Sequence, residues 1–214
     1  MKKKSIILGL IPLMLACKTE VSRTVVVYNN DFESNNLTNI TNGLTATYNG
    51  STVLGRYNSN VNKGFFDLSI NNLPKHDLVI VTFDLYIHDS WDGNKSAPDG
   101  PDIWEMKVDG NTYIYATFAN FQCSPTAICS PQSYPDNYPN FYHNPKTGAY
   151  ATNLPGICNA ANSTTLYKIS KTFRHSSSSL ILECSDKLIQ TNATDKLCDE
   201  SWSVDNLKVQ AVSL

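Results

Sequence analysis

The sequence predicts an all-β fold, an antiparallel β-sandwich of the jelly-roll type with long loops. Three observations support this prediction. Apolar and polar residues alternate with a period of two in many segments, as they do in half-buried strands. Asn, Ser and Thr number 23, 21 and 18, whereas Glu, common in helical bundles, occurs 5 times. Beyond the N-terminal region, no stretch of ten residues shows the 3.6-residue period of a helix.

Strands are expected where the alternation is clearest. In residues 79–89 the odd positions from Val79 to Ile87 are apolar and the even positions are mostly polar. Residues 104–108 alternate in the same way, and Asp109-Gly110 is a hairpin-turn signal leading to a partner strand at 113–118. The other expected strands are 24–29, 52–57, 65–70, 166–173, 180–184 and 201–212. Such strands, joined by long excursions, favour one jelly-roll domain over residues 25–214 rather than an immunoglobulin pattern.

The N-terminus has the features of an export signal. Three lysines at 2–4 precede an apolar run at 6–16, which is too short to span a bilayer at about 20 residues. The run ends in Met14-Leu15-Ala16-Cys17, which resembles the lipobox of bacterial lipoproteins, where the Cys is lipidated and becomes the new N-terminus. We expect a signal peptide at 1–16, then lipidated Cys17 and a tether to residue 24. The alternative is an ordinary secretory signal with an incidental cysteine.

Charge narrows the range of partners. The formal net charge is −2, and cleavage before Cys17 would remove three of the 17 basic residues and leave 19 acidic ones, a net charge of −5. A nucleic-acid partner is therefore not expected, because no basic excess exists to neutralise phosphates. An anionic membrane surface would not attract the chain either. We expect the lipid anchor to attach the protein to a membrane of the bacterial cell envelope. In a Gram-negative host this is the outer membrane, and the protein faces the periplasm or the exterior.

Five cysteines follow Cys17, so one is left unpaired or shared between molecules. Cys184 and Cys198 flank a polar excursion between apolar strands, and we expect them to form a disulfide, which an oxidising compartment permits. A second disulfide is expected between Cys123 and Cys129, which bracket a short loop. Cys158 is then the odd one, although its pairing with Cys123 or Cys129 is a close alternative. No CxxC pair or Cys/His cluster has the spacing of a zinc site.

Segments 30–33, 83–94, 100–104 and 200–206 resemble jelly-roll modules of bacterial secreted proteins, similar to concanavalin-like and carbohydrate-binding-module sandwiches. In those modules an early Asp-Phe-Glu and a late Asp-Asn often lie on neighbouring strands and often hold a structural calcium ion. The resemblance thus implies Ca²⁺ at Asp31, Glu33, Asp205 and Asn206. The apolar phase also flips across Asp205-Asn206, which indicates a bulge. The alternative is carboxylates capped by backbone amides.

A second acidic segment runs from Asp89 to Asp102. Its carboxylates would repel one another unless they were solvated or neutralised, and Asn94 adds a further oxygen ligand. We therefore weigh a calcium-bound loop with ligands at Asp89, Asp92, Asn94 and Asp102 against a solvated acidic turn.

Aromatic residues interleaved with Pro, Asn and Asp fill residues 132–150. Aromatic faces and amides suit sugar stacking and hydroxyl recognition, and long loops are often functional. The candidate ligand-binding residues are Tyr134, Tyr138, Tyr142 and His143, together with Tyr86 and His88 from the outward row of strand 79–89. The alternatives are a mini-core formed by the loop's own aromatics and an ordinary solvent face.

The motifs of common catalytic classes are missing from the sequence. It lacks a Gly-x-Ser-x-Gly elbow, a His-Glu-x-x-His pair, a phosphate loop and a dinucleotide fingerprint. His88, Asp89 and Ser90 are consecutive strand residues, which point to opposite faces and cannot act as a triad. We expect a non-catalytic envelope lipoprotein that binds glycan or another extracellular ligand. The alternatives are a polysaccharide-degrading enzyme with His143 or a Tyr as base, and a structural component of the envelope.

Overall fold

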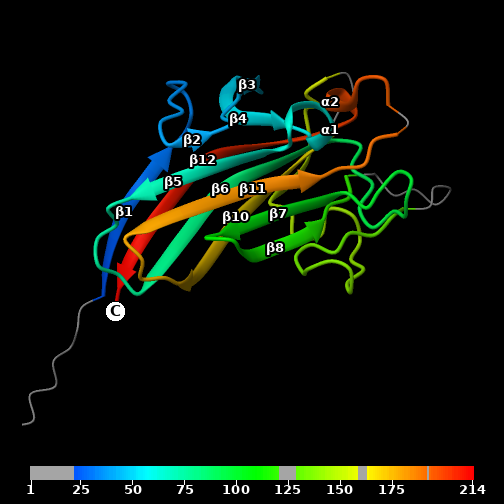
Figure 1. Cartoon of the computed structure of the whole chain (residues 1–214). Coiled ribbons are helices and arrows are strands. Elements are labelled where there is room, and N and C mark those ends of the chain that lie inside the picture. The colour runs from blue at the N-terminus through cyan, green and yellow to red at the C-terminus, as the bar shows by residue number, and fades with distance from the viewer. Residues whose placement is uncertain (1–21, 121–128, 159–162, 192) are drawn as a thin grey trace, which may run out of the picture.

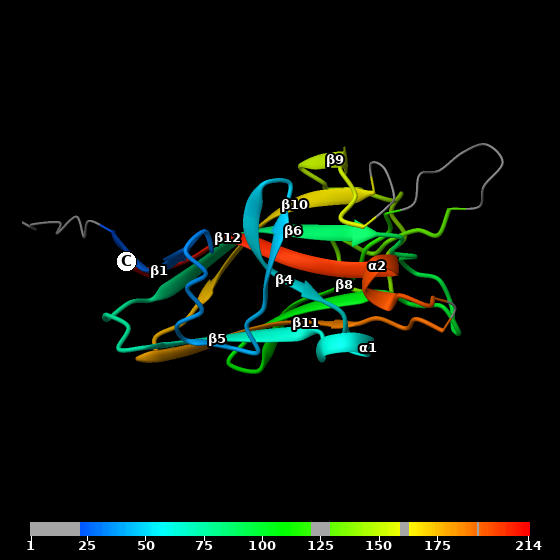
Figure 2. The same ribbon diagram turned by 90° about the horizontal axis from the view of Figure 1, so that it is seen from above.

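The computed structural model describes residues 22–120, 129–158, 163–191 and 193–214. In that part of the chain two antiparallel sheets pack face to face around one apolar core (Figure 1). Seen from above, β10, β6 and β12 lie in one layer and β5 and β11 in the other (Figure 2). The predicted all-β sandwich is confirmed. The predicted signal peptide, Cys17 and most of the tether lie outside the described residues.

The seven-stranded sheet has the order β3-β4-β12-β6-β10-β9, and β1 also pairs with β12. Its strands are β1 (Arg23–Asn30), β3 (Thr45–Tyr48), β4 (Ser51–Tyr57), β6 (Leu78–Asp89), β9 (Ala151–Leu154), β10 (Thr164–Arg174) and β12 (Glu200–Ser213). The five-stranded sheet has the order β2-β5-β11-β7-β8. Its strands are β2 (Ile40–Thr41), β5 (Phe65–Asn71), β7 (Ile103–Val108), β8 (Asn111–Thr117) and β11 (Ser179–Lys187).

The chain order of the strands is that of a jelly roll. The central strands of one sheet are β4-β12-β6-β10 and those of the other are β5-β11-β7-β8, so β4, β5, β6 and β7 alternate between sheets, as do β10, β11 and β12. The short helices α1 (Ser59–Asn62) and α2 (Lys196–Asp199) cap the same end of the sandwich (Figure 1). Within the described ranges, no helix is long and apolar enough to cross a membrane.

The core follows from the alternation in the sequence. The odd residues of β6 from Val79 to Ile87 are buried between the sheets, where the rings of Trp104 and Trp202 meet edge to face at 5.8 Å. On β12 the pairing with β6 skips from Asp205 to Lys208, which confirms the predicted bulge. The bulge lets both halves of this strand bury apolar side chains despite the change of phase.

The cysteine pairing differs from the prediction. Cys198 bonds to Cys158, with 5.5 Å between their Cα atoms, so the expected Cys184–Cys198 disulfide and the expected odd Cys158 are both wrong. Cys184 is free and buried, because it lies among the inward-facing positions of β11, where burial raises the pKa of its thiol well above the usual value. Cys129 is disulfide-bonded, and its predicted partner Cys123 lies outside the described residues.

Candidate functional site

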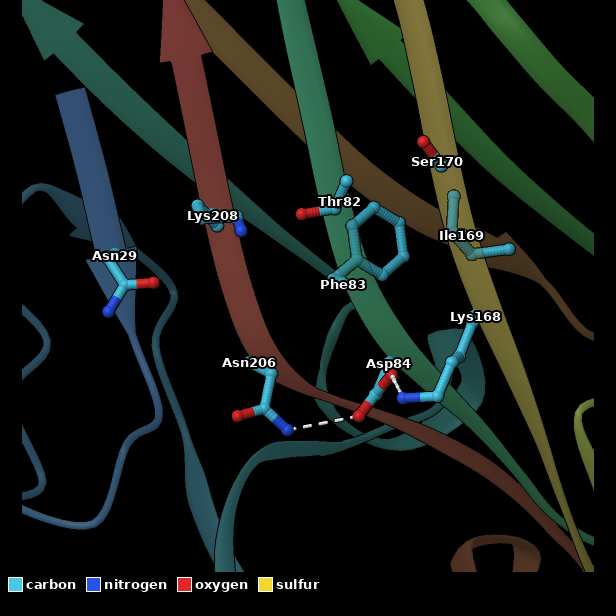
Figure 3. Close-up of a pocket in the computed structure, with 9 residues that line it drawn as sticks. All are labelled: Asn29, Thr82, Phe83, Asp84, Lys168, Ile169, Ser170, Asn206 and Lys208. Atoms are coloured by element: carbon cyan, nitrogen blue, oxygen red, sulfur yellow. Dashed lines mark hydrogen bonds and ion pairs between the residues drawn. The ribbon is translucent and has the colours of Figure 1, made fainter. Parts of the chain in front are cut away.

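A pocket of about 460 Å³ opens on the outer face of the seven-stranded sheet. Strands β1, β6, β10 and β12 supply its walls. Its lining residues are Asn29, Thr82, Phe83, Asp84, Lys168, Ile169, Ser170, Asn206 and Lys208 (Figure 3). Most of these side chains are polar because they occupy strand positions that alternate with the core residues. The pocket is therefore suited to a hydrophilic ligand.

Within this pocket, Asp84 lies between Lys168 and Asn206 (Figure 3). Lys168 is the residue of β10 that pairs with Asp84 of β6, and its Nζ lies 2.9 Å from Asp84 Oδ1. On the other side, Asn206 Nδ2 donates to Asp84 Oδ2 at 3.0 Å. Asn206 reaches this position from the bulge, where its φ is +53°, a conformation that Asn tolerates better than most residues. Both carboxylate oxygens are thus held by neighbours.

Asp205 lies beside this array, directly across from Asp84 in the pairing of β12 with β6. Its side chain is buried, and Oδ1 accepts the Asn206 backbone N–H at 2.7 Å. Burial, followed by the charges of Asp84, Glu33 and Asp31, raises the pKa of Asp205 to about 6. The clamped carboxylate of Asp84 therefore lies next to a carboxylate that gains a proton in mildly acidic solution.

Aromatic rings border the polar array. Tyr86 lies two residues along β6 from Asp84 on the same face, half-buried, with the ring of Tyr48 at 5.1 Å. Tyr150 is 68% exposed, and Lys168 Nζ lies 4.7 Å from its ring centroid. Partly exposed tyrosines beside hydrogen-bonding groups form a surface on which a sugar ring can stack while its hydroxyls are bound.

His88 was predicted to share this binding face, and the structure contradicts that prediction. Its side chain is fully buried, and its ring nitrogens contact Thr164 Oγ1 at 3.0 Å and Ser203 Oγ at 2.7 Å. Burial lowers the pKa of His88 to about 3, so the ring is neutral at physiological pH. It faces outward as the alternation indicates, but Tyr48 from β3 covers it, with the two rings 4.8 Å apart.

In the aromatic loop after residue 129, one candidate ligand-binding residue packs against the core of the sandwich, and not in a mini-core of the loop's own aromatics. Tyr134 packs against Phe118 and Tyr167, with ring centroids 4.8 and 5.1 Å away. The backbone N–H of Tyr138 donates to the Tyr115 carbonyl of β8, so this loop lies along the five-stranded sheet.

Two members of this loop remain accessible. His143 Nε2 contacts Asp136 Oδ2 at 2.9 Å and its ring stacks on Phe141, while Tyr142 is 73% exposed. These side chains extend from a loop along the other sheet, so they do not form one site with Tyr86. Tyr150, from the same aromatic stretch, contacts Lys168, which lines the outer-face pocket.

The acidic residues that follow the first strand, Asp31 and Glu33, are held mainly by hydrogen bonds. The Glu33 carboxylate accepts from the Ser51 hydroxyl and the Thr52 N–H, which lowers the pKa of Glu33. Asp31 Oδ1 accepts the Glu33 N–H at 3.3 Å. Within the described residues Asp31, Glu33 and Asp205 do not gather at ligand distance. These bonds agree with the amide-capped alternative, and Ca²⁺ binding here stays a prediction.

The acidic segment after β6 is divided by the structure. Asp92 and Asp102 come together with Glu200, the first residue of β12, with one carboxylate oxygen of each within 4.8 Å of the others. Asn94 instead accepts from Thr117 and donates to the Phe141 carbonyl at 2.9 Å. Asp89 Oδ1 accepts from Ser163 at 2.9 Å, and burial is the main cause that raises its pKa to about 6.

Two residues that matter here were not among the predicted site residues. Lys168 occupies an outward position of the predicted strand 166–173, so the alternation of the sequence predicts which face of the sheet it lies on. Its position beside Asp84 depends on the pairing of β10 with β6. Glu200 is about one hundred residues away from Asp92 and Asp102 in the sequence. Its approach to them depends on the return of the last strand beside β6. Neither approach has a local sequence signal.

The chain matches no protein-family model and no curated protein by sequence. Among solved structures it is similar to latent PorU from Porphyromonas gingivalis, at 8% identity and a TM-score of 0.38 over 70% of this chain, spanning 10% of PorU. The C-terminal CBM6 of LamC from Zobellia galactanivorans matches at 10% identity and a TM-score of 0.36, covering 88% of this chain and 99% of the module. A family 35 carbohydrate-binding module from Clostridium thermocellum matches at 14% identity and a TM-score of 0.36, covering 87% of this chain and 97% of the module. At such identities a likeness concerns the fold alone.

Proposed function

We propose that this chain is a non-catalytic protein of the bacterial cell envelope that binds a glycan in the outer-face pocket. The observation that carries the proposal is the clamped array of Asp84, Lys168 and Asn206 beside Tyr86 and Tyr150. None of these polar groups fills the core between the sheets. Their neighbours fix their directions before a ligand arrives, which lowers the entropic cost of binding.

The chemistry of the array matches that of a sugar. Each hydroxyl of a sugar ring can donate one hydrogen bond and accept others, so a carboxylate, an ammonium and an amide side by side can bind neighbouring hydroxyls. The apolar face of the ring requires an aromatic surface, which the exposed ring of Tyr150 offers. Two lysines and one aspartate line the pocket, so neutral and uronic-acid glycans should both be tested.

Binding is tested with glycan microarrays, followed by calorimetry on the best ligand. Lys168→Ala should weaken the affinity at least tenfold, because it removes a hydrogen-bond donor and frees Asp84. Lys187→Ala is the matched control, since Lys187 also lies over a tyrosine, 4.5 Å from the Tyr115 ring centroid, but on the other sheet. No binding to any glycan, or equal losses in both variants, would contradict the proposal.

Attachment to the envelope rests on the lipobox-like sequence that ends at Cys17. Cys17→Ser should move the protein from the membrane fraction to the soluble fraction of its host cells, because the cysteine would carry the acyl chains. A variant that still sediments with membranes as the parent does would refute lipid anchoring at this residue, while leaving the glycan proposal untouched.

A second candidate function is glycoside hydrolysis by Asp84 and Asp205. Side chains directly opposite on antiparallel strands have Cβ atoms about 4.5–5.5 Å apart, and retaining glycosidases use carboxyl pairs at about 5–5.5 Å. The raised pKa of Asp205 would suit a general acid. Release of reducing ends from a bound polysaccharide, abolished in Asp205→Asn, would establish this activity in place of the non-catalytic function.

A further inference from the structure

Three carboxylates from distant parts of the sequence converge at the end of the sandwich that carries α1 and α2. Asp92 and Asp102 belong to the connection between β6 and β7, and Glu200 begins β12. One oxygen from each lies within 4.8 Å of the others, and among the described residues this is the sole group of three such side chains. The backbone holds this geometry, since Asp102 accepts the Asp92 N–H through Oδ2 and donates its own N–H to the Gly93 carbonyl at 3.0 Å.

Two members of the cluster are buried, and each has one oxygen without a partner. The exposed fraction is 0% for Asp102 and 1% for Glu200. Asp102 Oδ1 and Glu200 Oε2 are buried oxygens without a hydrogen-bond partner, and such groups are rare in proteins because they cost free energy. Lys95 pairs with Asp92 Oδ2 at 2.7 Å, but no cationic side chain pairs with Asp102 or Glu200 in the described parts of the chain.

Something must neutralise this charge, and there are two candidates. Burial, with the neighbouring carboxylates, raises the pKa of Asp102 and of Glu200, so protons are one candidate. A shared proton, however, joins two oxygens, whereas a divalent cation can engage all three carboxylates at once. A set made of carboxylate oxygens alone is the donor set of hard cations such as Ca²⁺.

We infer that Asp92, Asp102 and Glu200 form a divalent-cation site, selective for Ca²⁺ in an exported chain. The ion binds the carboxylate of each of the three residues. It completes its coordination shell with water from the side of Asp92, whose side chain is 20% exposed. It fastens the β6–β7 connection to the start of β12. The hydrogen bonds from Ser90 N–H and Oγ to the Asp199 carbonyl, at 2.8 and 2.9 Å, already hold these two segments side by side.

This site is independent of the glycan pocket, and its ligand set differs from the loop set expected from sequence. The experiment uses the purified protein, stripped with EGTA and titrated with CaCl₂ and, separately, with MgCl₂. We expect one bound Ca²⁺ per chain by elemental analysis and a melting temperature that rises by about 5 °C or more with excess Ca²⁺. Because ligand carboxyls must lose protons to bind, Ca²⁺ should also release protons into a weak buffer.

Variants place the ion. Glu200→Gln keeps the shape and removes the charge, so it should lose the Ca²⁺ response and the proton release. Asp92→Asn should lose both responses too. It replaces Glu200→Gln in the experiment if that variant, with its substitution at a buried position, does not fold. Asp205→Asn is the matched control and should keep both responses. The inference is overturned if Ca²⁺ has no effect and Glu200→Gln melts no lower than the parent, which means that protons neutralise the cluster. It is also overturned if Asp205→Asn alone loses the response.

Discussion

The outer-face pocket and the buried cluster both contain carboxylates, and these carboxylates differ in their hydrogen bonding. Asp84 has a partner on each oxygen, with Lys168 on one side and Asn206 on the other. Asp102 and Glu200 each keep a buried oxygen without a partner. A carboxylate with both oxygens engaged presents fixed directions to a ligand, whereas oxygens left without donors in the interior favour a cation. We therefore infer the proposed role of each acidic region from the hydrogen-bond partners of its carboxylates, more than from the number of acidic residues.

Asp186 shows that burial alone does not create an ion site. It is also buried, but its oxygens accept from the Ser59 N–H at 2.9 Å, the Leu188 N–H at 3.1 Å and the Trp202 indole N–H at 2.7 Å. These donors satisfy the carboxylate without a metal. Asp186 is therefore a structural carboxylate. It is the reference case of a buried carboxylate whose charge is satisfied by hydrogen-bond donors of the protein.

The largest expected effect concerns the disulfide next to the cluster. Cys198 lies two residues before Glu200 and bonds to Cys158, 40 residues away in sequence. Opening a loop of that length should lower the free energy of unfolding by about 4 kcal/mol in the chain-entropy model. Urea unfolding of Cys158→Ser measures this, and Ca²⁺ affinity should fall while glycan affinity stays within twofold. Unchanged stability would show that this disulfide does not hold the two segments together.

Removing the structural carboxylate should have the next largest effect. Asp186→Ala leaves the buried Trp202 indole N–H and two backbone amides without an acceptor, so we expect a loss of about 3 kcal/mol in the free energy of unfolding. Denaturant unfolding with and without Ca²⁺ measures it, and the increment due to Ca²⁺ should remain. Asp99→Ala, in the more exposed part of the β6–β7 connection, is the control and should change stability by less than about 0.5 kcal/mol. An Asp186→Ala protein without a Ca²⁺ increment would break the distinction between the two kinds of buried acid.

The smallest effect is a pH dependence of stability due to Asp205. Its pKa rises to about 6 in the folded protein and is ordinary, about 4, in the unfolded chain. Folding therefore takes up protons between these values, and the contribution of Asp205 to stability falls as the pH rises from about 4 to 6. Asp205→Asn should remove a change in the free energy of unfolding of about 2 kcal/mol over this window, measured as the difference from the parent by urea unfolding. Parallel curves for the two proteins would show that Asp205 has no raised pKa.

Much of the fold could be predicted because it is encoded locally. The alternation in residues 79–89, the Asp109-Gly110 turn and the change of phase at Asp205-Asn206 correspond to β6, the β7–β8 hairpin and the β12 bulge. Each depends on neighbours in sequence. The disulfide could not be derived in this way, because the approach of Cys158 to Cys198 depends on how β9, β10 and α2 pack.

The candidate site could be predicted only in part, for the same reason. Alternation placed Tyr86 and Asp84 on the outward face of β6, but it did not show that Tyr48 would cover His88. It indicated an acidic loop around Asp92 and Asp102, yet Glu200 joins them through long-range pairing of β12 with β6. Pairings between distant strands are set by the fold as a whole.

Anomalous diffraction from crystals soaked in a lanthanide, which substitutes for Ca²⁺ at oxygen sites, tests the central distinction most directly. We predict a strong peak bounded by the carboxylates of Asp92, Asp102 and Glu200, lost in crystals of Glu200→Gln. We predict no ion bridging Asp84 and Lys168 in the outer-face pocket. Crystals without a peak among the three carboxylates, or with an ion in the pocket instead, would contradict the assignment of the two regions.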